Sequence, residues 1–366
     1  MTEQRLPKRA LIMAGGTGGH VFPGLAVARY LREQGVDVHW LGTQQGLESR
    51  LVPEANIPLH FITISGLRGK GMKALLLAPL KLTAAIYQAR KVIQAINPDI
   101  VIGMGGFVSG PGGVASWLMG RPLVIHEQNA KVGLTNKLLA TFAKRVLEGF
   151  PTAFKPQAKV RVVGNPVRQE IENLPAPEER FSVNAANKAP LKLLVLGGSL
   201  GAQALNALVP RTLELLSQEE RPEVRHQTGD KHFDAAKNDY ESMGIQVTLT
   251  PFIKDMAEAY GWADIVLCRA GALTVAELCV AGLGAVFVPF PHAVDDHQTA
   301  NADFMVKHKA ALCVQQAELT PARLADIVRE FNGAPEYRLA MAQAAYQLRK
   351  VKVAEKIYAI CQEVWR

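Results

Sequence analysis

The chain has 366 residues, of which 48% are hydrophobic, 7% aromatic and 20% charged. This length suits two domains or one large α/β domain, and this composition excludes disordered and fibrous chains. Residues 1–170 contain 21 Lys and Arg against 9 Asp and Glu, whereas residues 171–366 contain 20 against 24. The first half therefore has a net charge of +12, which favours an anionic partner such as nucleic acid or anionic lipid.

The four cysteines are widely spaced and form no CxxC pair, so neither a zinc site nor a disulfide framework is indicated. A reduced cytosolic compartment is the simplest interpretation. The N-terminal residues lack the apolar run of a signal peptide. The longest uncharged stretch, residues 100–120, contains seven glycines and one proline, and suits a strand and loop better than a membrane-spanning helix.

Short, continuously apolar runs predict buried parallel strands along the whole chain. In the first half they cover residues 10–14, 36–41, 59–64, 100–103, 122–125, 145–149 and 160–163. In the second half they cover residues 192–197, 224–228, 246–250, 264–268, 285–290 and 311–314. Helical patterns between them, for example 23–34, 83–96, 203–217 and 322–331, predict an α/β fold of doubly wound parallel sheets.

Two segments share one plan of strand, glycine-rich turn and helix: RALIMAGGTGGH at 9–20 and LKLLVLGGSLGA at 191–202. This repeat, about half a chain apart, predicts two similar domains, with the boundary in the proline-containing stretch 164–190. We assign residues 1–168 to the first domain and 169–340 to the second. Residues 341–366, the end of a helical stretch over 336–365, are expected to pack back on the first domain.

Three glycine-rich loops each follow a predicted strand: GGTGGH, GMGGFVSGPGG at 103–113, and GGSLGA. They are consistent with simple tight turns. Three of them at the carboxyl ends of strands favour phosphate or diphosphate binding, since glycines allow close approach and helix N-termini favour negative charge. The chain has no GxxxxGK[ST] sequence, and GGTGGH has Val21 where GxGxxG needs its last glycine, so P-loop enzymes and dinucleotide dehydrogenases are disfavoured.

Several polar residues follow other predicted strands. His20 is either a capping histidine or a general base, because a neutral imidazole can accept a proton near pH 7. His126 and Glu127 belong to HEQN, which is not the zinc motif HExxH. Arg168 is either a surface ion-pair partner or a bidentate diphosphate ligand. Glu277 is either a solvated glutamate or a carboxylate that accepts two sugar hydroxyls.

These motifs together resemble the MurG family, the N-acetylglucosaminyltransferases of bacterial peptidoglycan synthesis in glycosyltransferase family 28. The resemblance rests on GGTGGHVFPGLAVA (15–28), ISGLRGKG (64–71), GMGGFVSGPGG, HEQN, GNPVR (164–168), GGSLGA, CRAGALTVAE (268–277) and DDHQTANA (295–302). It implies a GT-B fold, two Rossmann-like domains facing a cleft. It further implies inverting, metal-independent transfer of N-acetylglucosamine from UDP-N-acetylglucosamine to the C4 hydroxyl of lipid I, giving lipid II, without a cofactor.

The resemblance also assigns roles to residues. His20 is the general-base candidate. The expected contacts to UDP-N-acetylglucosamine are Thr17, Gly18, Gly19, Asn129, Arg168, Ser199, Ile253, Ala272, Leu273, Thr274, Val275, Ala276, Glu277 and Gln298. The expected contacts to the acceptor diphosphate or sugar are Gly105, Gly106, His126 and Glu127. His297 stands where some relatives have a second glutamine beside Gln298.

An apolar segment ringed by cations provides a candidate membrane patch: Arg68, Lys70, Lys73, Leu75, Leu76, Leu77, Leu80 and Lys81. It is consistent with a core helix that has a solvated basic end. A lipid-linked acceptor favours peripheral attachment to the cytoplasmic face of the inner membrane instead, where each basic residue contributes about 1 kcal/mol. The resemblance also implies cell-wall and cell-division proteins as partners.

Two other functions remain open from the sequence: a UDP-N-acetylglucosamine 2-epimerase of similar fold, and a non-catalytic membrane protein that senses a nucleotide sugar. A nucleic-acid partner is disfavoured, because the chain has no basic run interleaved with aromatic residues.

Overall fold

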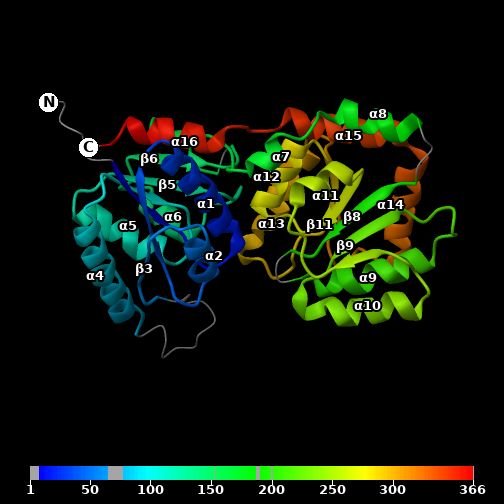
Figure 1. The fold of residues 1–366 in the computed structure, drawn as a ribbon, viewed down its shortest axis with the longest axis horizontal. Helices are drawn as coiled ribbons and strands as arrows, with labels where there is room; N and C mark the ends of the chain where they lie inside the picture. The colour runs from blue at the N-terminus through cyan, green and yellow to red at the C-terminus, as the bar shows by residue number, and fades with distance from the viewer. Residues whose placement is uncertain (1–7, 65–76, 152, 187–189, 199–200, 366) are drawn as a thin grey trace. The chain divides into compact units, whose positions relative to one another are not determined.

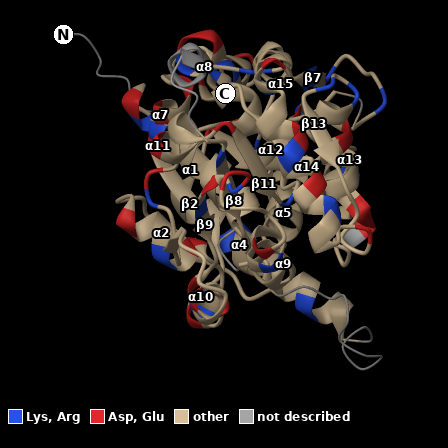
Figure 2. Ribbon diagram, turned by 90° about the vertical axis from the view of Figure 1, so that its right-hand side faces the viewer, with Lys and Arg blue, Asp and Glu red and all other residues tan. Residues whose placement is uncertain are grey.

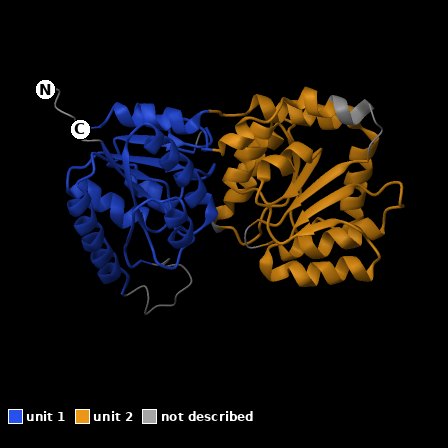
Figure 3. Cartoon of the chain, viewed as in Figure 1, with its two compact units in different colours: residues 1–166, 352–366 blue, residues 167–351 orange. Residues whose placement is uncertain are grey.

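The computed structural model describes residues 8–64, 77–151, 153–186, 190–198 and 201–365, and the chain divides into two compact units (Figure 3). Unit 1 consists of residues 1–166 and 352–366, and unit 2 of residues 167–351. Each unit has its own parallel sheet with helices on both faces (Figure 1). The doubly wound α/β architecture expected from the sequence is therefore confirmed.

Among its described residues, unit 1 forms a seven-stranded parallel sheet in the order β3-β2-β1-β4-β5-β6-β7. The strands are β1 Arg9–Met13, β2 Asp37–Gly42, β3 Leu59–Phe61, β4 Ile100–Gly103, β5 Leu123–Glu127, β6 Arg145–Glu148 and β7 Val160–Val162. The helices are α1 Gly18–Glu33, α2 Glu48–Glu54, α4 Ala78–Ile96, α5 Ser109–Leu118, α6 Leu134–Leu139 and α16 Val353–Gln362.

Unit 2 repeats the same plan, with a parallel sheet in the order β10-β9-β8-β11-β12-β13. Its strands are β8 Lys192–Leu196, β9 Glu223–Gln227, β10 Thr248–Thr250, β11 Ile265–Cys268, β12 Gly284–Phe287 and β13 Ala311–Cys313. Its helices are α7 Gln169–Glu172, α8 Pro177–Ala186, α9 Gln203–Glu214, α10 Phe233–Ser242, α11 Met256–Trp262, α12 Ala272–Ala281, α13 His297–Val306, α14 Pro321–Gly333 and α15 Pro335–Gln347, with short 3-10 turns η1 Asp230–His232 and η2 Val294–Asp296.

Strand β1 explains why the central runs are apolar at every position. Ala10 and Ile12 pack into the core under α1 and α16, while Leu11 and Met13 pack into the core under α4 and α5. Successive side chains of a strand point to opposite faces, so a strand covered on both faces needs apolar residues throughout. Every strand expected from such a run is confirmed, with ends that differ by a few residues.

The C-terminal region differs from the continuous helical stretch expected over residues 336–365. It contains two helices, α15 and α16, separated by residues 348–352. The last of these, Lys352, is the N-cap of α16 and has a left-handed φ of 55°. Helix α15 belongs to unit 2, whereas α16 packs on α1 in unit 1. The side chains of Val353, Ile357 and Cys361 are at most 1% exposed there, so the last helix completes the core of the first unit.

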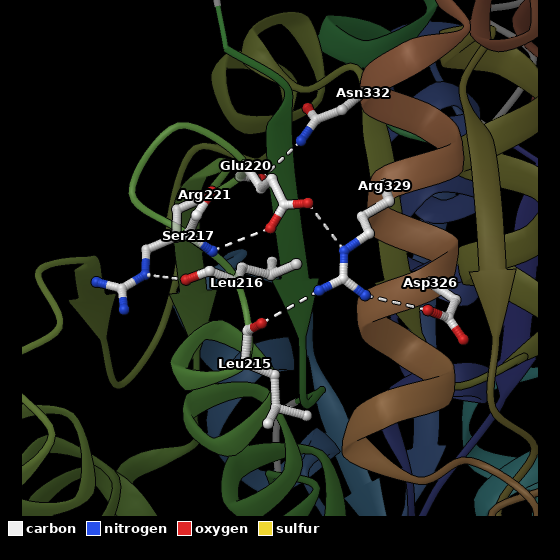
Figure 4. Close-up of polar contacts among 8 residues, drawn as sticks. All are labelled: Leu215, Leu216, Ser217, Glu220, Arg221, Asp326, Arg329 and Asn332. Atoms are coloured by element: carbon white, nitrogen blue, oxygen red, sulfur yellow. Dashed lines mark hydrogen bonds and ion pairs between the residues drawn. The ribbon is translucent and has the colours of Figure 1, made fainter.

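In unit 2, arginine side chains donate hydrogen bonds to backbone carbonyls at and near the C-termini of helices. Arg180 donates to the carbonyls of Tyr260 and Gly282, near the C-termini of α11 and α12. On α14, Arg329 donates to Glu220 at 3.0 Å, to Asp326 at 3.1 Å and to the Leu215 carbonyl at 3.2 Å (Figure 4). The contacts of Arg329 attach α14 to the segment between α9 and β9.

Candidate functional site

The glycine loops lie at the point of each sheet where the strand order reverses. In unit 1 the loops after β1 and β4, which are neighbouring strands, carry GGTGGH and GMGG. In unit 2 the loops after β8 and β11, also neighbours, carry GGSLGA and CRAGA. Open α/β sheets bind ligands outside the carboxyl ends of strands at this switch point. Each unit therefore has one candidate binding edge.

A buried glutamate holds the first glycine loop. Glu48, the first residue of α2, is 0% exposed, and its carboxylate accepts from the Gly16 amide at 2.9 Å and from the Thr43 amide at 2.8 Å. The Thr43 hydroxyl donates to the same carboxylate at 2.8 Å. This residue joins the loops after β1 and β2, and it was not identified from the sequence because it belongs to no recognisable motif.

Two glycines of the β4 loop are required by close packing. A Cβ atom on Gly106, whose φ is +81°, would lie 2.3 Å from the Gly15 carbonyl oxygen, so the two glycine loops touch through their backbones. A Cβ atom on Gly105 would lie 2.5 Å from Nδ1 of His20. The expected acceptor contacts Gly105 and Gly106 thus lie beside the proposed catalytic histidine.

His20 lies in the first turn of α1 and bonds to Gln128, the residue after β5, which in turn bonds to His126 within β5. Nδ1 of His20 is 3.2 Å from Oε1 of Gln128, and Nε2 of Gln128 is 2.8 Å from the Met104 carbonyl and 3.1 Å from Nδ1 of His126. Nε2 of His126 is 2.8 Å from the Gly164 carbonyl. Gln128 bonds to both histidines and so connects them. The sequence analysis did not identify this role, because Gln128 appeared there only as a member of HEQN.

Glu127 is directed into its own loop. One oxygen accepts from the backbone and side-chain amides of Asn129, at 3.0 and 3.3 Å, and the other from Gly133 at 3.1 Å and Asn136 at 3.0 Å. Glu127 is 3% exposed and His126 is fully buried. The expected contact of both residues with the acceptor stays a prediction. In the structure, Glu127 bonds to Asn129 and His126 bonds to Gln128.

In unit 2, Arg168 and Glu277 lie together. Nη2 of Arg168, the residue that precedes α7, donates to Oε1 of Glu277 in α12 at 3.0 Å, and the Tyr260 hydroxyl donates to Oε2 at 2.9 Å. Burial raises the pKa of Glu277, and the charge of Arg168 opposes that rise. Tyr260 was not identified from the sequence, because a tyrosine in the middle of a helix carries no motif.

Helix α12 starts at the candidate edge, with Gly271 as its N-cap, so the expected contacts Ala272–Glu277 form its first turns. Gln298, in α13, accepts from the Phe290 amide at 2.9 Å, and Asn301 donates to the Ala270 carbonyl at 3.1 Å. These two residues connect the loops after β11 and β12. Ile253 follows β10 at the same carboxyl edge and is partly exposed.

Some expected site residues lie outside the described residues: Ser199, Arg68, Lys70, Lys73, Leu75 and Leu76. Of the candidate membrane patch, Leu77, Leu80 and Lys81 are described, at and near the start of α4. Leu77 is 49% exposed and Leu80 is 70% exposed. Helix α4 buries Ala85, Ala89, Ile93 and Ile96 in the core, so the expected core helix with a solvated end is present, and that end also presents apolar side chains to solvent.

Helix α10 of unit 2 contains the exposed acidic residues Asp234, Asp239 and Glu241 together with the exposed Lys237. Figure 2 colours the acidic parts of the α10 ribbon red. Across the described ranges, no group of three or more His, Cys, Asp or Glu is placed to hold a metal ion. No helix in those ranges is long and apolar enough to span a bilayer.

Comparison with family models places the chain in a class of enzymes. Residues 10–148 match the glycosyltransferase family 28 N-terminal domain, and residues 192–357 match the family 28 C-terminal domain. The chain belongs to glycosyltransferase family 28, and it has the GT-B fold of two Rossmann-like domains.

Its curated relatives share most of its length. The chain is 53% identical over 356 residues to the UDP-N-acetylglucosamine--N-acetylmuramyl-(pentapeptide) pyrophosphoryl-undecaprenol N-acetylglucosamine transferase of Marinobacter nauticus, which covers 97% of both chains. It is 52% identical to the enzyme of the same name from Aeromonas hydrophila, which covers 98% of both chains. A resemblance to MurG is therefore confirmed.

Solved structures agree with this assignment. Acinetobacter baumannii MurG superimposes with a TM-score of 0.83 at 40% identity, covering 98% of this chain and 100% of that one. A UDP-GlcNAc 2-epimerase from Neisseria meningitidis bound to UDP-GlcNAc gives a TM-score of 0.68 at 13% identity, covering 97% and 100%. That lower similarity shows a shared fold and does not support the epimerase alternative.

Proposed function

We propose that this chain transfers N-acetylglucosamine from UDP-N-acetylglucosamine to the C4 hydroxyl of the N-acetylmuramic acid in lipid I, giving lipid II and UDP. The observation that carries this proposal is the 53% identity to an enzyme of that name over 97% of both chains. The paired glycine loops at the switch points support it, because they suit diphosphate ligands in both units.

Unit 2 supplies most of the donor contacts in this proposal, and Thr17, Gly18, Gly19 and Asn129 of unit 1 supply the others. Arg168 and the N-terminus of α12 balance the charge of the UDP diphosphate, together with the loop that contains Ser199. Glu277 accepts from the ribose hydroxyls, and Ile253 offers backbone groups to uracil. Gln298 contacts the sugar. No metal ion takes part in the chemical step.

Unit 1 supplies the acceptor contacts and the base. The C4 oxygen attacks the anomeric carbon of N-acetylglucosamine, the bond from that carbon to the UDP oxygen breaks, and the configuration inverts. His20 takes the proton of the C4 hydroxyl, and UDP leaves with the bonding electrons. Arg168 stabilises the charge that grows on UDP.

We also propose that α4 and its preceding segment attach unit 1 to anionic lipid on the cytoplasmic face of the inner membrane. Helix α4 exposes Leu80 and, at 57%, Tyr87, and its neighbour α5 exposes Trp117 at 53% and Leu118 at 60%. Lys81 and Lys91 lie on α4 together with Leu80 and Tyr87. Such a combination binds anionic membranes reversibly without spanning them.

One assay separates this function from its alternatives. The chain is incubated with UDP-N-acetylglucosamine and a lipid I analogue, and UDP, lipid product and sugar epimer are measured together. A lipid-linked disaccharide formed with one UDP per product supports the transferase. An epimerised sugar without lipid product would instead indicate an epimerase, and binding of the nucleotide sugar without turnover would indicate a sensor.

A further inference from the structure

The series of hydrogen bonds behind His20 determines which ring nitrogen of that residue carries the proton. A neutral histidine has one N–H donor and one acceptor nitrogen, and the hydrogen-bond partners decide which is which. The series starts at a backbone carbonyl, which can only accept, and each later group is then assigned in turn.

The first group is His126. Its Nε2 lies 2.8 Å from the Gly164 carbonyl oxygen, so Nε2 carries the hydrogen. Burial lowers the pKa of His126 to about 4, so the ring is neutral near pH 7. Its Nδ1 is then an acceptor, directed at Nε2 of Gln128, 3.1 Å away.

The second group is Gln128, whose amide has one possible orientation. Its Nε2 lies 2.8 Å from the Met104 carbonyl oxygen and 3.1 Å from the acceptor Nδ1 of His126. Turning the amide over would place its oxygen against both acceptors and lose both bonds in a site where Gln128 is only 1% exposed. Oε1 of Gln128 therefore faces His20.

The third group is His20 itself. Oε1 of Gln128 can only accept, and it lies 3.2 Å from Nδ1 of His20, so Nδ1 is the donor. We propose that Gln128 and His126 are positioning residues that hold His20 in the tautomer with the hydrogen on Nδ1 and the lone pair on Nε2. Nε2 is then the atom that takes the acceptor proton.

The surroundings keep this series fixed. The side chain of Asn165 donates to the backbone carbonyl of Gln128 at 3.0 Å, which holds the loop after β5 in place. Gly105 leaves room for the His20 ring beside the amide of Gln128, since a Cβ atom there would lie 3.2 Å from Oε1 of Gln128. The partner of Nδ1 is a neutral amide rather than a carboxylate, so it orients the ring without adding a charge.

The inference rests on the proposed function for the role of His20, but its geometry can be measured without turnover. The full chain is labelled with ¹⁵N-histidine, and long-range ¹H–¹⁵N spectra are recorded at about pH 8, where imidazoles are mostly neutral. Among the nine histidines, His20 is identified by the signals lost in His20→Gln. A hydrogen on Nδ1 supports the inference, whereas a hydrogen on Nε2 of the wild-type residue overturns it.

Gln128→Met removes both the acceptor and the donor at nearly constant volume. We expect His20 to move toward the tautomer with its hydrogen on Nε2, and kcat to fall about tenfold, the size of one ordinary hydrogen bond. The KM for UDP-N-acetylglucosamine stays unchanged, because the tautomer affects proton transfer. An unchanged tautomer in a folded Gln128→Met protein overturns the inference, and if that variant does not fold, the wild-type spectrum still decides.

Asn136→Leu is the matched control. Asn136 is a buried amide that also bonds to the loop after β5, through the His126 carbonyl and Glu127, but its side chain does not bond to His20 or Gln128. The His20 tautomer is expected to stay as in the wild type. If the wild-type hydrogen is on Nδ1 but His20→Ala keeps its turnover, the base role of His20 fails and the positioning inference stands. If the wild-type hydrogen is on Nε2 but His20→Ala loses its turnover, the positioning inference fails and the base role stands.

Discussion

Arg168 and Glu277 form an ion pair across 109 residues of sequence, with Nη2 of the arginine 3.0 Å from Oε1 of the glutamate. The carboxylate is 7% exposed and the arginine side chain 40% exposed, so the pair joins a buried acceptor to a solvent-facing donor. Both residues are expected to contact UDP. A change in the charge of Glu277 therefore alters the orientation of Arg168, and a change in the orientation of Arg168 alters the environment of Glu277.

Glu277→Gln is expected to weaken UDP binding about tenfold or more, because charged hydrogen bonds contribute about 1.5–3 kcal/mol each. The variant removes the charge that holds Arg168 while keeping the shape of the side chain. Calorimetric titration with UDP measures the effect. Glu258→Gln is the control, since Glu258 pairs with Arg225 at 2.7 Å on the surface and should leave UDP affinity unchanged. Equal UDP affinity in Glu277→Gln and wild type would contradict the ribose and diphosphate assignment.

His20→Ala is expected to lower kcat in the lipid assay by about 10²-fold or more, the usual contribution of a general base. UDP affinity should change little, since the donor contacts of unit 2 stay intact. His308→Ala provides the comparison, because His308 is an exposed residue just after α13, where its Nδ1 bonds to the Phe304 carbonyl. Near-normal turnover of His20→Ala would remove the base role.

The membrane proposal predicts that Lys70, Lys73 and Lys81 all changed to Glu will lose most binding to anionic vesicles. Each basic residue near an anionic leaflet contributes about 1 kcal/mol, and the reversal of charge adds repulsion. Co-sedimentation with vesicles that contain phosphatidylglycerol measures the bound fraction.

The matched control for the membrane experiment changes Lys237, Lys307 and Lys309 to Glu. These residues alter net charge by the same amount, but they are exposed in unit 2. Their vesicle binding should stay close to that of the wild type. Unchanged binding after the triple change in unit 1, or equal losses in both triple variants, would show that the α4 segment is not the membrane contact.

His226 gives unit 2 a stability that depends on pH. Its ring is 0% exposed and lies between the Tyr240 hydroxyl at 2.9 Å and Asn206 at 3.0 Å, and burial lowers its pKa from 6.5 to about 3. Because the folded-state pKa is depressed, this stability is fully present above pH 6.5 and is lost as the pH falls toward 3. Between pH 6.5 and about 4.5 the loss is about 2 kcal/mol.

The measurement is urea unfolding of wild type and His226→Gln at both pH values. Glutamine keeps a donor and an acceptor but does not titrate, so the wild type should lose about 2 kcal/mol more than the variant on acidification. Parallel losses in the two proteins would mean that His226 does not titrate on unfolding.

The elements that the sequence predicts well are those encoded within a few neighbouring residues. Apolar runs such as LLVL located the central strands, and the glycine loops that follow them located both binding edges. What the sequence did not predict are contacts between distant segments. Glu48 lies 32 residues from Gly16, and Gln128 lies 108 from His20, so their roles depend on how the strands are ordered in the sheet. The break between α15 and α16 at residues 348–352 was also missed, because the helical pattern continues on both sides of it.

The return of α16 to unit 1 has a consequence for how the protein is made. Unit 2 is a continuous stretch that ends at Val351, whereas unit 1 needs Val353, Ile357 and Cys361 to close its core. Since a ribosome synthesises these residues after all of unit 2, the domain that begins first can finish folding only after the domain that begins second has been synthesised. Nascent chains stalled before α16 should accordingly be cut by protease in unit 1 while unit 2 resists.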